Sequence, residues 1–182
     1  MKFLITGLLV TAYLFLSGCA SLDEKWSIDQ QSFKANTSNL KIGDIIITSK
    51  DWKRPMSWFG HSAVMVSKYK VGEYPEPCYG YYETDIILWL REKKEFTALR
   101  YKKFDAEFKT AFLNNLPETK DKKYRITSKT DNGSFYCSQY IWYLYWKTAK
   151  DLGRVLDIDK NGGYLVTPSD LLNSKYFDKV VF

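Results

Sequence analysis

Apolar and polar positions change their spacing several times along the chain, and the changes predict alternating strands and turns in its first half. The stretch IGDIIIT is a Gly-Asp turn followed by β-branched residues, which predicts a buried strand near 44–48. Strict alternation in HSAVMVSKY predicts a strand near 61–69. The glycine and two prolines of KVGEYPEP predict a turn, after which CYGYYET and FTALRYK predict two further strands.

The second half of the chain shows helical spacing. FDAEFKTAFLNNL predicts one helix, and another is expected from near Cys137 to about Lys147, with Ser134 as its candidate cap. VTPSDLLNS predicts a short helix that Thr167 caps and whose N-terminal dipole Asp170 complements. FDKVVF predicts a closing strand. The pattern as a whole predicts an α+β domain with a mainly antiparallel sheet packed against helices.

The N-terminus, MKFLITGLLVTAYLFLSGCAS, carries one cation before an apolar run from Phe3 to Leu16. That run is shorter than the roughly 20 residues of a membrane-spanning helix, so residues 1–18 are predicted to be a signal peptide. The ending LSGC resembles the lipobox of bacterial lipoproteins. The resemblance implies an acylated Cys19 at the start of the mature chain and, with Ala20 behind it, the periplasmic face of a Gram-negative outer membrane. The alternative is an ordinary signal peptide with a chance cysteine.

Composition and charge narrow the function classes. Residues 19–39 are polar and weakly patterned and are predicted to be the lipidated N-terminus and a tether, and residues 40–182 a single folded domain. The net charge of +6 comes from scattered lysines and arginines without a nucleic-acid motif, which favours anionic envelope surfaces and argues against nucleic acid. Phosphate-binding loops, dinucleotide fingerprints and zinc-ligand spacings do not occur, so we expect neither a cofactor nor a structural metal.

The chain has a single histidine, His61, which is the natural candidate for a base near neutral pH. If the strand at 61–69 pairs with the strand ending at Glu83 around a turn centred on Gly72, Glu83 lies directly opposite His61. A carboxylate there would hold one imidazole nitrogen and leave the other free to act. The alternative for Glu83 is a solvated charge at the end of a strand.

Cys137 is predicted to lie in the first turn of a helix, where the dipole and a nearby imidazolium lower the pKa of a thiol. The backbone N–H groups of such a turn can also receive a developing oxyanion. Two other interpretations stay open, which are a small buried hydrophobe and a disulfide with Cys78. Tyr136 and Trp58, which neighbour Cys137 and His61 in the sequence, are candidates for substrate binding.

The motifs IGDIIIT, GHSAVMV, YYET, FYCSQYIWYLY and VTPSDLLNS, in this order over residues 40–176, resemble the permuted NlpC-type, papain-like family (YiiX/YaeF-like). The resemblance implies a circularly permuted papain-like fold with Cys137 as nucleophile, His61 as general base and Glu83 as the third, acidic residue. The chain departs from the family at Thr84, where a small apolar residue is usual.

These observations predict a lipid-anchored cysteine hydrolase of the cell envelope, an amidase or peptidase that forms an acyl-enzyme on Cys137. The expected partner is a cell-wall peptide or a lipid-linked amide or ester. Two alternatives stay open: a lipid amidase, thioesterase or acyltransferase that uses the same triad, and a lipoprotein binding module without catalysis.

Overall fold

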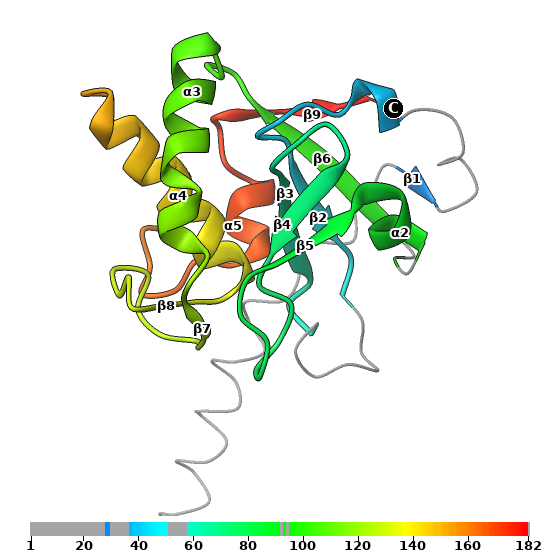
Figure 1. Cartoon of the computed structure of the whole chain (residues 1–182), viewed down its shortest axis with the longest axis horizontal. Helices are drawn as coiled ribbons and strands as arrows, with labels where there is room; N and C mark the ends of the chain where they lie inside the picture. The colour runs from blue at the N-terminus through cyan, green and yellow to red at the C-terminus, as the bar shows by residue number, and fades with distance from the viewer. Residues whose placement is uncertain (1–27, 30–36, 51–57, 92, 94, 182) are drawn as a thin grey trace, which may run out of the picture.

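A computed structural model describes residues 28–29, 37–50, 58–91, 93 and 95–181 (Figure 1). The predicted signal peptide, Cys19 and most of the predicted tether lie outside these residues. Within that tether, Ile28 and Asp29 pair with a strand of the domain, and residues 37–39 form a 3-10 turn, η2 (Thr37–Asn39). Within the described residues, none of the helices is both long and apolar enough to cross a membrane.

An antiparallel sheet forms the centre of the domain. In the described part of the chain it has seven strands, ordered β1 (Ile28–Asp29), β6 (Glu95–Tyr101), β2 (Ile45–Thr48), β3 (His61–Met65), β4 (Lys70–Glu73) and β5 (Tyr82–Asp85), with β9 (Phe177–Val180) also on β6. All strand pairs in this sheet are antiparallel. A second, small parallel pair is formed by β7 (Lys123–Tyr124) and β8 (Ser134–Phe135).

The helices are α2 (Ile86–Arg91), α3 (Ala106–Asn115), α4 (Cys137–Asp151) and α5 (Pro168–Leu172), with a 3-10 turn η4 (Pro117–Thr119) after α3. Local signals fix two of the helix starts. Asp105 caps α3 by accepting a hydrogen bond from the backbone N–H of Phe108, and Thr167 and Asp170 form a capping box on α5, as predicted. The predicted cap Ser134 is wrong, because Ser134 belongs to β8 and Tyr136 is the N-cap of α4.

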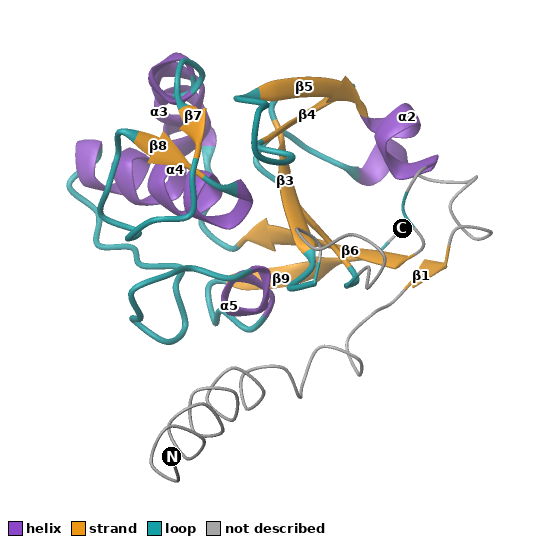
Figure 2. Cartoon of the chain, turned by 90° about the horizontal axis from the view of Figure 1, so that it is seen from below, coloured by secondary structure: helices purple, strands orange, loops and turns teal. Residues whose placement is uncertain are grey.

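Apolar side chains fill both faces of the sheet. The larger core cluster joins Val64 of β3 to Tyr140 and Ile141 of α4, and the smaller one joins Met65 to Trp89 of α2. In Figure 2, α3 and α4 lie together on one side and α2 lies at the far end of β4 and β5. Since both faces are covered, β2 is buried along its whole length, as its unbroken isoleucine run predicts. The predicted α+β class is confirmed.

Besides the short strands β1, β7 and β8 and the two 3-10 turns, which were not predicted, two elements differ from the sequence prediction. Residues 70–73, predicted to lie in a turn, form β4, and the chain reverses earlier, where Ser67 accepts hydrogen bonds from the backbone N–H groups of Tyr69 and Lys70. Gly72 is required there by packing rather than by a turn, since a Cβ at this position would collide with the side chain of Tyr81. Helix α2 was not predicted.

Gly60 fixes the entry into β3. Its φ of +82° is in the left-handed region, and a Cβ there would lie 2.8 Å from the carbonyl oxygen of Thr48. Gly153 also has a positive φ, of +65°, but a Cβ on it would meet no described atom within 4 Å.

We therefore expect Gly60→Ala to lower the free energy of unfolding by about 2–3 kcal/mol, since strain and a backbone clash combine. Gly153→Ala should lower it by about 1 kcal/mol, which is the strain alone. Urea unfolding of both variants measures the difference, and equal losses would contradict the proposed clash at Gly60.

Candidate active site

Cys137 is the first residue of α4 and is almost fully buried, with 8% of its surface exposed. Tyr136 before it is extended, so the helix begins abruptly at the thiol, where the N-terminal dipole favours negative charge. Cys137 is a free thiol, and Cys78 is also free and exposed, so the alternative of a disulfide between them is wrong.

Val166, in the segment before α5, forms hydrogen bonds with both sequence neighbours of Cys137. The backbone N–H of Val166 donates to the Tyr136 hydroxyl at 2.8 Å, and the Ser138 hydroxyl donates to the Val166 carbonyl at 2.7 Å. The VTPSD motif therefore stabilises the start of α4 rather than supplying a reactive group. Tyr136, predicted to bind substrate, has its hydroxyl engaged in this contact.

His61, the first residue of β3, is paired with a carboxylate. Its Nε2 lies 2.6 Å from Oε2 of Glu73, the last residue of β4, and both side chains are buried. This pairing leaves Nδ1 as the nitrogen available to Cys137. The arrangement has the order that a Cys–His–acid triad requires, with the acid behind the imidazole.

The predicted acid, Glu83, is wrong. Glu83 accepts hydrogen bonds from Lys120 Nζ at 2.6 Å and from the Tyr81 hydroxyl at 2.9 Å, and it pairs across the sheet with Gly72. The predicted register failed because β4 lies between β3 and β5, so that Glu83 is two strands away from His61.

A shorter hairpin, in which residues 70–73 pair directly with the strand that begins at His61, would have identified Glu73. The observed register pairs Val64 with Gly72 and Met65 with Val71, which places Glu73 diagonally across from His61. Diagonal neighbours are within reach of long side chains. The sequence signal for the acid was Glu73, the single carboxylate of KVGE. It was missed because KVGE was assigned to a turn rather than to a strand.

The three buried groups favour a charged Cys–His pair. Burial opposes the charge on His61, but the neighbouring Cys137 and then Glu73 outweigh it and raise the pKa of His61 to about 9. Burial likewise opposes ionisation of Cys137, but His61 and the backbone N–H and hydroxyl of Ser62 lower its pKa below the ordinary value. Glu73 also has a lowered pKa, because its contact with His61 exceeds the effect of burial.

Two further aromatic residues border this group, and sequence analysis found neither. The ring centroid of Trp89, on α2, lies 6.1 Å from that of His61. The indole N–H of Trp89 is close enough to Glu73 to help lower the pKa of that carboxyl, although it forms no hydrogen bond of standard geometry. The pKa of Tyr124 is raised first by burial and then by Cys137. Tyr124 pairs with Phe135, two residues before the thiol.

Trp58, the other predicted substrate-binding residue, is 45% exposed and lies three residues before His61. Its role in substrate binding stays a prediction.

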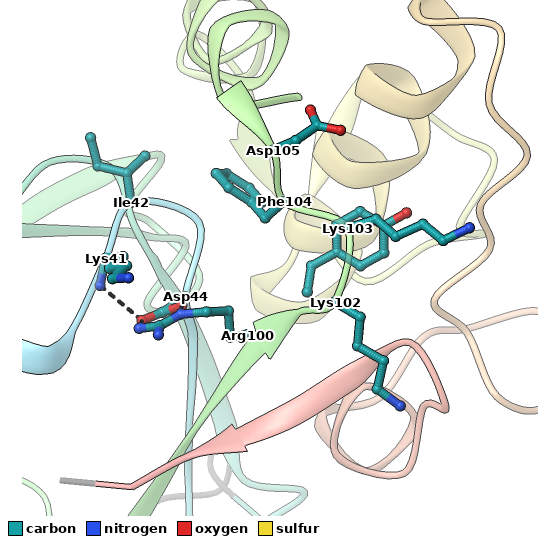
Figure 3. A pocket seen from close by; sticks show the side chains of 9 residues that line it. Lys41, Ile42, Asp44, Arg100, Lys102, Lys103, Phe104 and Asp105 are labelled. Atoms are coloured by element: carbon teal, nitrogen blue, oxygen red, sulfur yellow. Dashed lines mark hydrogen bonds and ion pairs between the residues drawn. The ribbon is translucent and has the colours of Figure 1, made fainter. Parts of the chain in front are cut away.

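A different hollow lies at the opposite end of the sheet. Figure 3 shows this cavity of about 300 Å³, where Asp44 accepts from the Lys41 backbone N–H at 2.8 Å and from Arg100 Nε at 2.8 Å. Asp44 therefore has a structural role. Among the described residues that line this cavity there is no cysteine or histidine, so the triad remains the candidate active site.

The antiparallel sheet packed against helices is consistent with a papain-like α+β fold. The structure is similar to the crystal structure of the metalloprotein YiiX from Escherichia coli O157:H7, described as DUF1105, with a TM-score of 0.60 and 15% sequence identity. The similarity covers 79% of this chain and 97% of that chain. No family model and no curated protein matches the sequence. At 15% identity the similarity shows the fold alone.

The charge of His61 can be measured directly, because it is the only histidine in the chain. We expect its NMR signals to titrate with a pKa of about 9 in the wild type and at a lower value in Cys137→Ala, which loses the main group that raises it. With a folded pKa above the unfolded value of 6.5, this charge stabilises the fold fully below about pH 6.5. The contribution is lost as pH rises through about 9. A wild-type pKa at or below 6.5 would contradict the charged pair.

Proposed function

We propose that this protein is a cysteine hydrolase of the permuted NlpC-type, papain-like family, which cleaves an amide or ester bond. The observation that carries the proposal is the contact of His61 with Glu73 beside a thiol at the start of α4. The raised pKa of His61 and the lowered pKa of Cys137 support it, because functional sites are where such opposed shifts concentrate.

In the proposed reaction the Cys137 thiolate attacks the substrate carbonyl carbon. The backbone N–H groups of the first turn of α4 stabilise the oxyanion. The imidazolium of His61 gives its proton to the leaving amine or alcohol, and the carbon–heteroatom bond breaks to leave a thioester on Cys137. Neutral His61 then takes a proton from water, whose oxygen attacks the thioester and releases the acid. Glu73 holds Nε2 throughout and fixes the ring orientation.

The structurally similar YiiX is described as a metalloprotein, which raises the question whether the residues of this chain fit a metal ion. In the ranges that the structure describes, no three histidine, cysteine or acidic side chains gather to hold one. Asp157, Asp159 and Asn161 alternate as in a calcium loop. However, Lys129 Nζ lies 2.6 Å from Asp159 and 3.8 Å from Asp157, so an ammonium already occupies the position beside these carboxylates. A metal site does not fit, and no step depends on one.

The proposed setting is the cell envelope, with Cys19 lipidated and a cell-wall peptide as the substrate. The sequence supports the setting through its predicted signal peptide and its lipobox resemblance, and the family resemblance supports the substrate class. A lipid-linked amide or ester is the second substrate class for the same triad, and the experiment below includes it.

The test compares two glutamates of neighbouring strands on purified peptidoglycan sacculi and on a micellar lipid amide. Glu73→Gln should lower kcat by roughly 100-fold or more, because the imidazole loses its orienting charge. Glu83→Gln should stay within about twofold of the wild type, since a partly exposed ion pair contributes little.

Release of muropeptides from sacculi supports the peptidase, and turnover of the micellar substrate alone supports the lipid amidase. A wild-type protein inactive on both, with Cys137→Ala retaining its biological role, would support a binding module and overturn the proposal.

A further inference from the structure

The hydroxyl of Ser62 is a buried polar group that the proposed mechanism does not use. Ser62 is completely buried, and no described residue satisfies its Oγ with a hydrogen bond of standard geometry. An unsatisfied buried hydroxyl destabilises a fold, and such a group needs an explanation. A buried serine beside His61, in a strand that otherwise packs apolar side chains, points to a partner that takes the hydrogen bond in another state of the protein.

The position of Ser62 identifies that partner. Ser62 pairs with Ile47 in the centre of the sheet, so its backbone is fixed. Its side chain shares a face of β3 with Val64, which packs in the same core cluster as Tyr140 and Ile141 of α4. The hydroxyl therefore points toward the beginning of α4, where Cys137 lies.

The chemistry of the sulfur explains why the hydroxyl is unpaired. In the thiol state the sulfur can donate to the Ser138 hydroxyl, 3.9 Å away. A thiolate has lost that proton and can only accept. Ser62 supplies two donors, its backbone N–H and its hydroxyl, and both favour the ionised sulfur.

We propose that the Ser62 hydroxyl donates a hydrogen bond to the Cys137 thiolate once it forms, and so holds the sulfur in its nucleophilic state. The proposal rests on the proposed function, because it assigns a further residue to the same site. It makes Ser62 a second stabiliser of the thiolate beside His61, acting through a hydrogen bond rather than through charge.

Other titratable groups near the sulfur act differently. His61 reaches it from β3 with Glu73 behind. Tyr124 from β7 and Tyr136 from the N-cap are neutral phenols whose pKa values are raised first by burial and then by the sulfur. Removal of the Ser62 hydroxyl leaves all four of these side chains in place, so its effect on the thiolate can be measured separately.

The experiment follows the pH dependence of iodoacetamide alkylation at Cys137 in the full chain, read by peptide mass spectrometry. Exposed Cys78 provides a reference thiol in the same molecule. Ser62→Ala should raise the alkylation midpoint of Cys137 by about one pH unit, which means roughly tenfold slower alkylation below both midpoints. Ser62→Gly removes the same hydroxyl and should give the same shift, which separates the loss of the donor from a packing effect.

Thr97→Val is the matched control. Thr97 of β6 is also completely buried, and it pairs with Ile47, the residue that pairs with Ser62 on the other side of β2. Loss of its hydroxyl should leave the Cys137 midpoint unchanged, because Thr97 lies two strands away from Ser62 in the sheet.

The outcomes separate the two proposals. A wild-type Cys137 with a low midpoint that both Ser62 variants retain would overturn the role of Ser62 and leave the proposed function standing. If wild-type Cys137 reacts with the same pH profile as Cys78, the proposed function fails and the role of Ser62 fails with it.

Discussion

The packing of α4 against β3 is the contact on which the site depends. Ile141 and Leu144 of α4 are completely buried with Val64 of β3 in one core cluster, and each such side chain contributes roughly 1.5–3 kcal/mol when it leaves water. Removing charges from water costs several kcal/mol per ion. The helix–sheet contact can offset that cost, and so it can hold His61, Glu73 and Cys137 together in a buried place.

The same contact places the two groups so that the Cys137 thiol tends to lose its proton and the His61 imidazole tends to keep one. The helix start and the Ser62 donors favour negative charge on Cys137, while the Glu73 carboxylate favours positive charge on His61. Neither shift needs a metal or a distant charge. Such a pair is already a thiolate and an imidazolium before substrate binds. This requires that Gly60 fixes the entry into β3 and that the segment at Val166 fixes the start of α4.

Sequence analysis predicted the features that local signals control. The strands at Ile45–Thr48 and Glu95–Tyr101, the helix beginning at Cys137 and the capping box at Thr167 all have residue patterns of their own. Strand β4 and helix α2 do not. Gly72 favours a turn by itself and is explained only by its packing on Tyr81, and IILWLR is too short and uniformly apolar to distinguish helix from strand. Because the turn was placed at Gly72, the predicted strand register was wrong, and the acid was assigned to Glu83 instead of Glu73.

The most direct test of the account is acylation by a p-nitrophenyl ester, followed by nitrophenolate release and by mass spectrometry of the cysteine peptides. The proposed mechanism predicts a burst of one equivalent, with the acyl group on Cys137 and subsequent turnover. Acylation should be much slower in His61→Ala and on the exposed Cys78 of the same molecule. Acylation of Cys78 as fast as that of Cys137, or a Cys137 burst unchanged by His61→Ala, would contradict it.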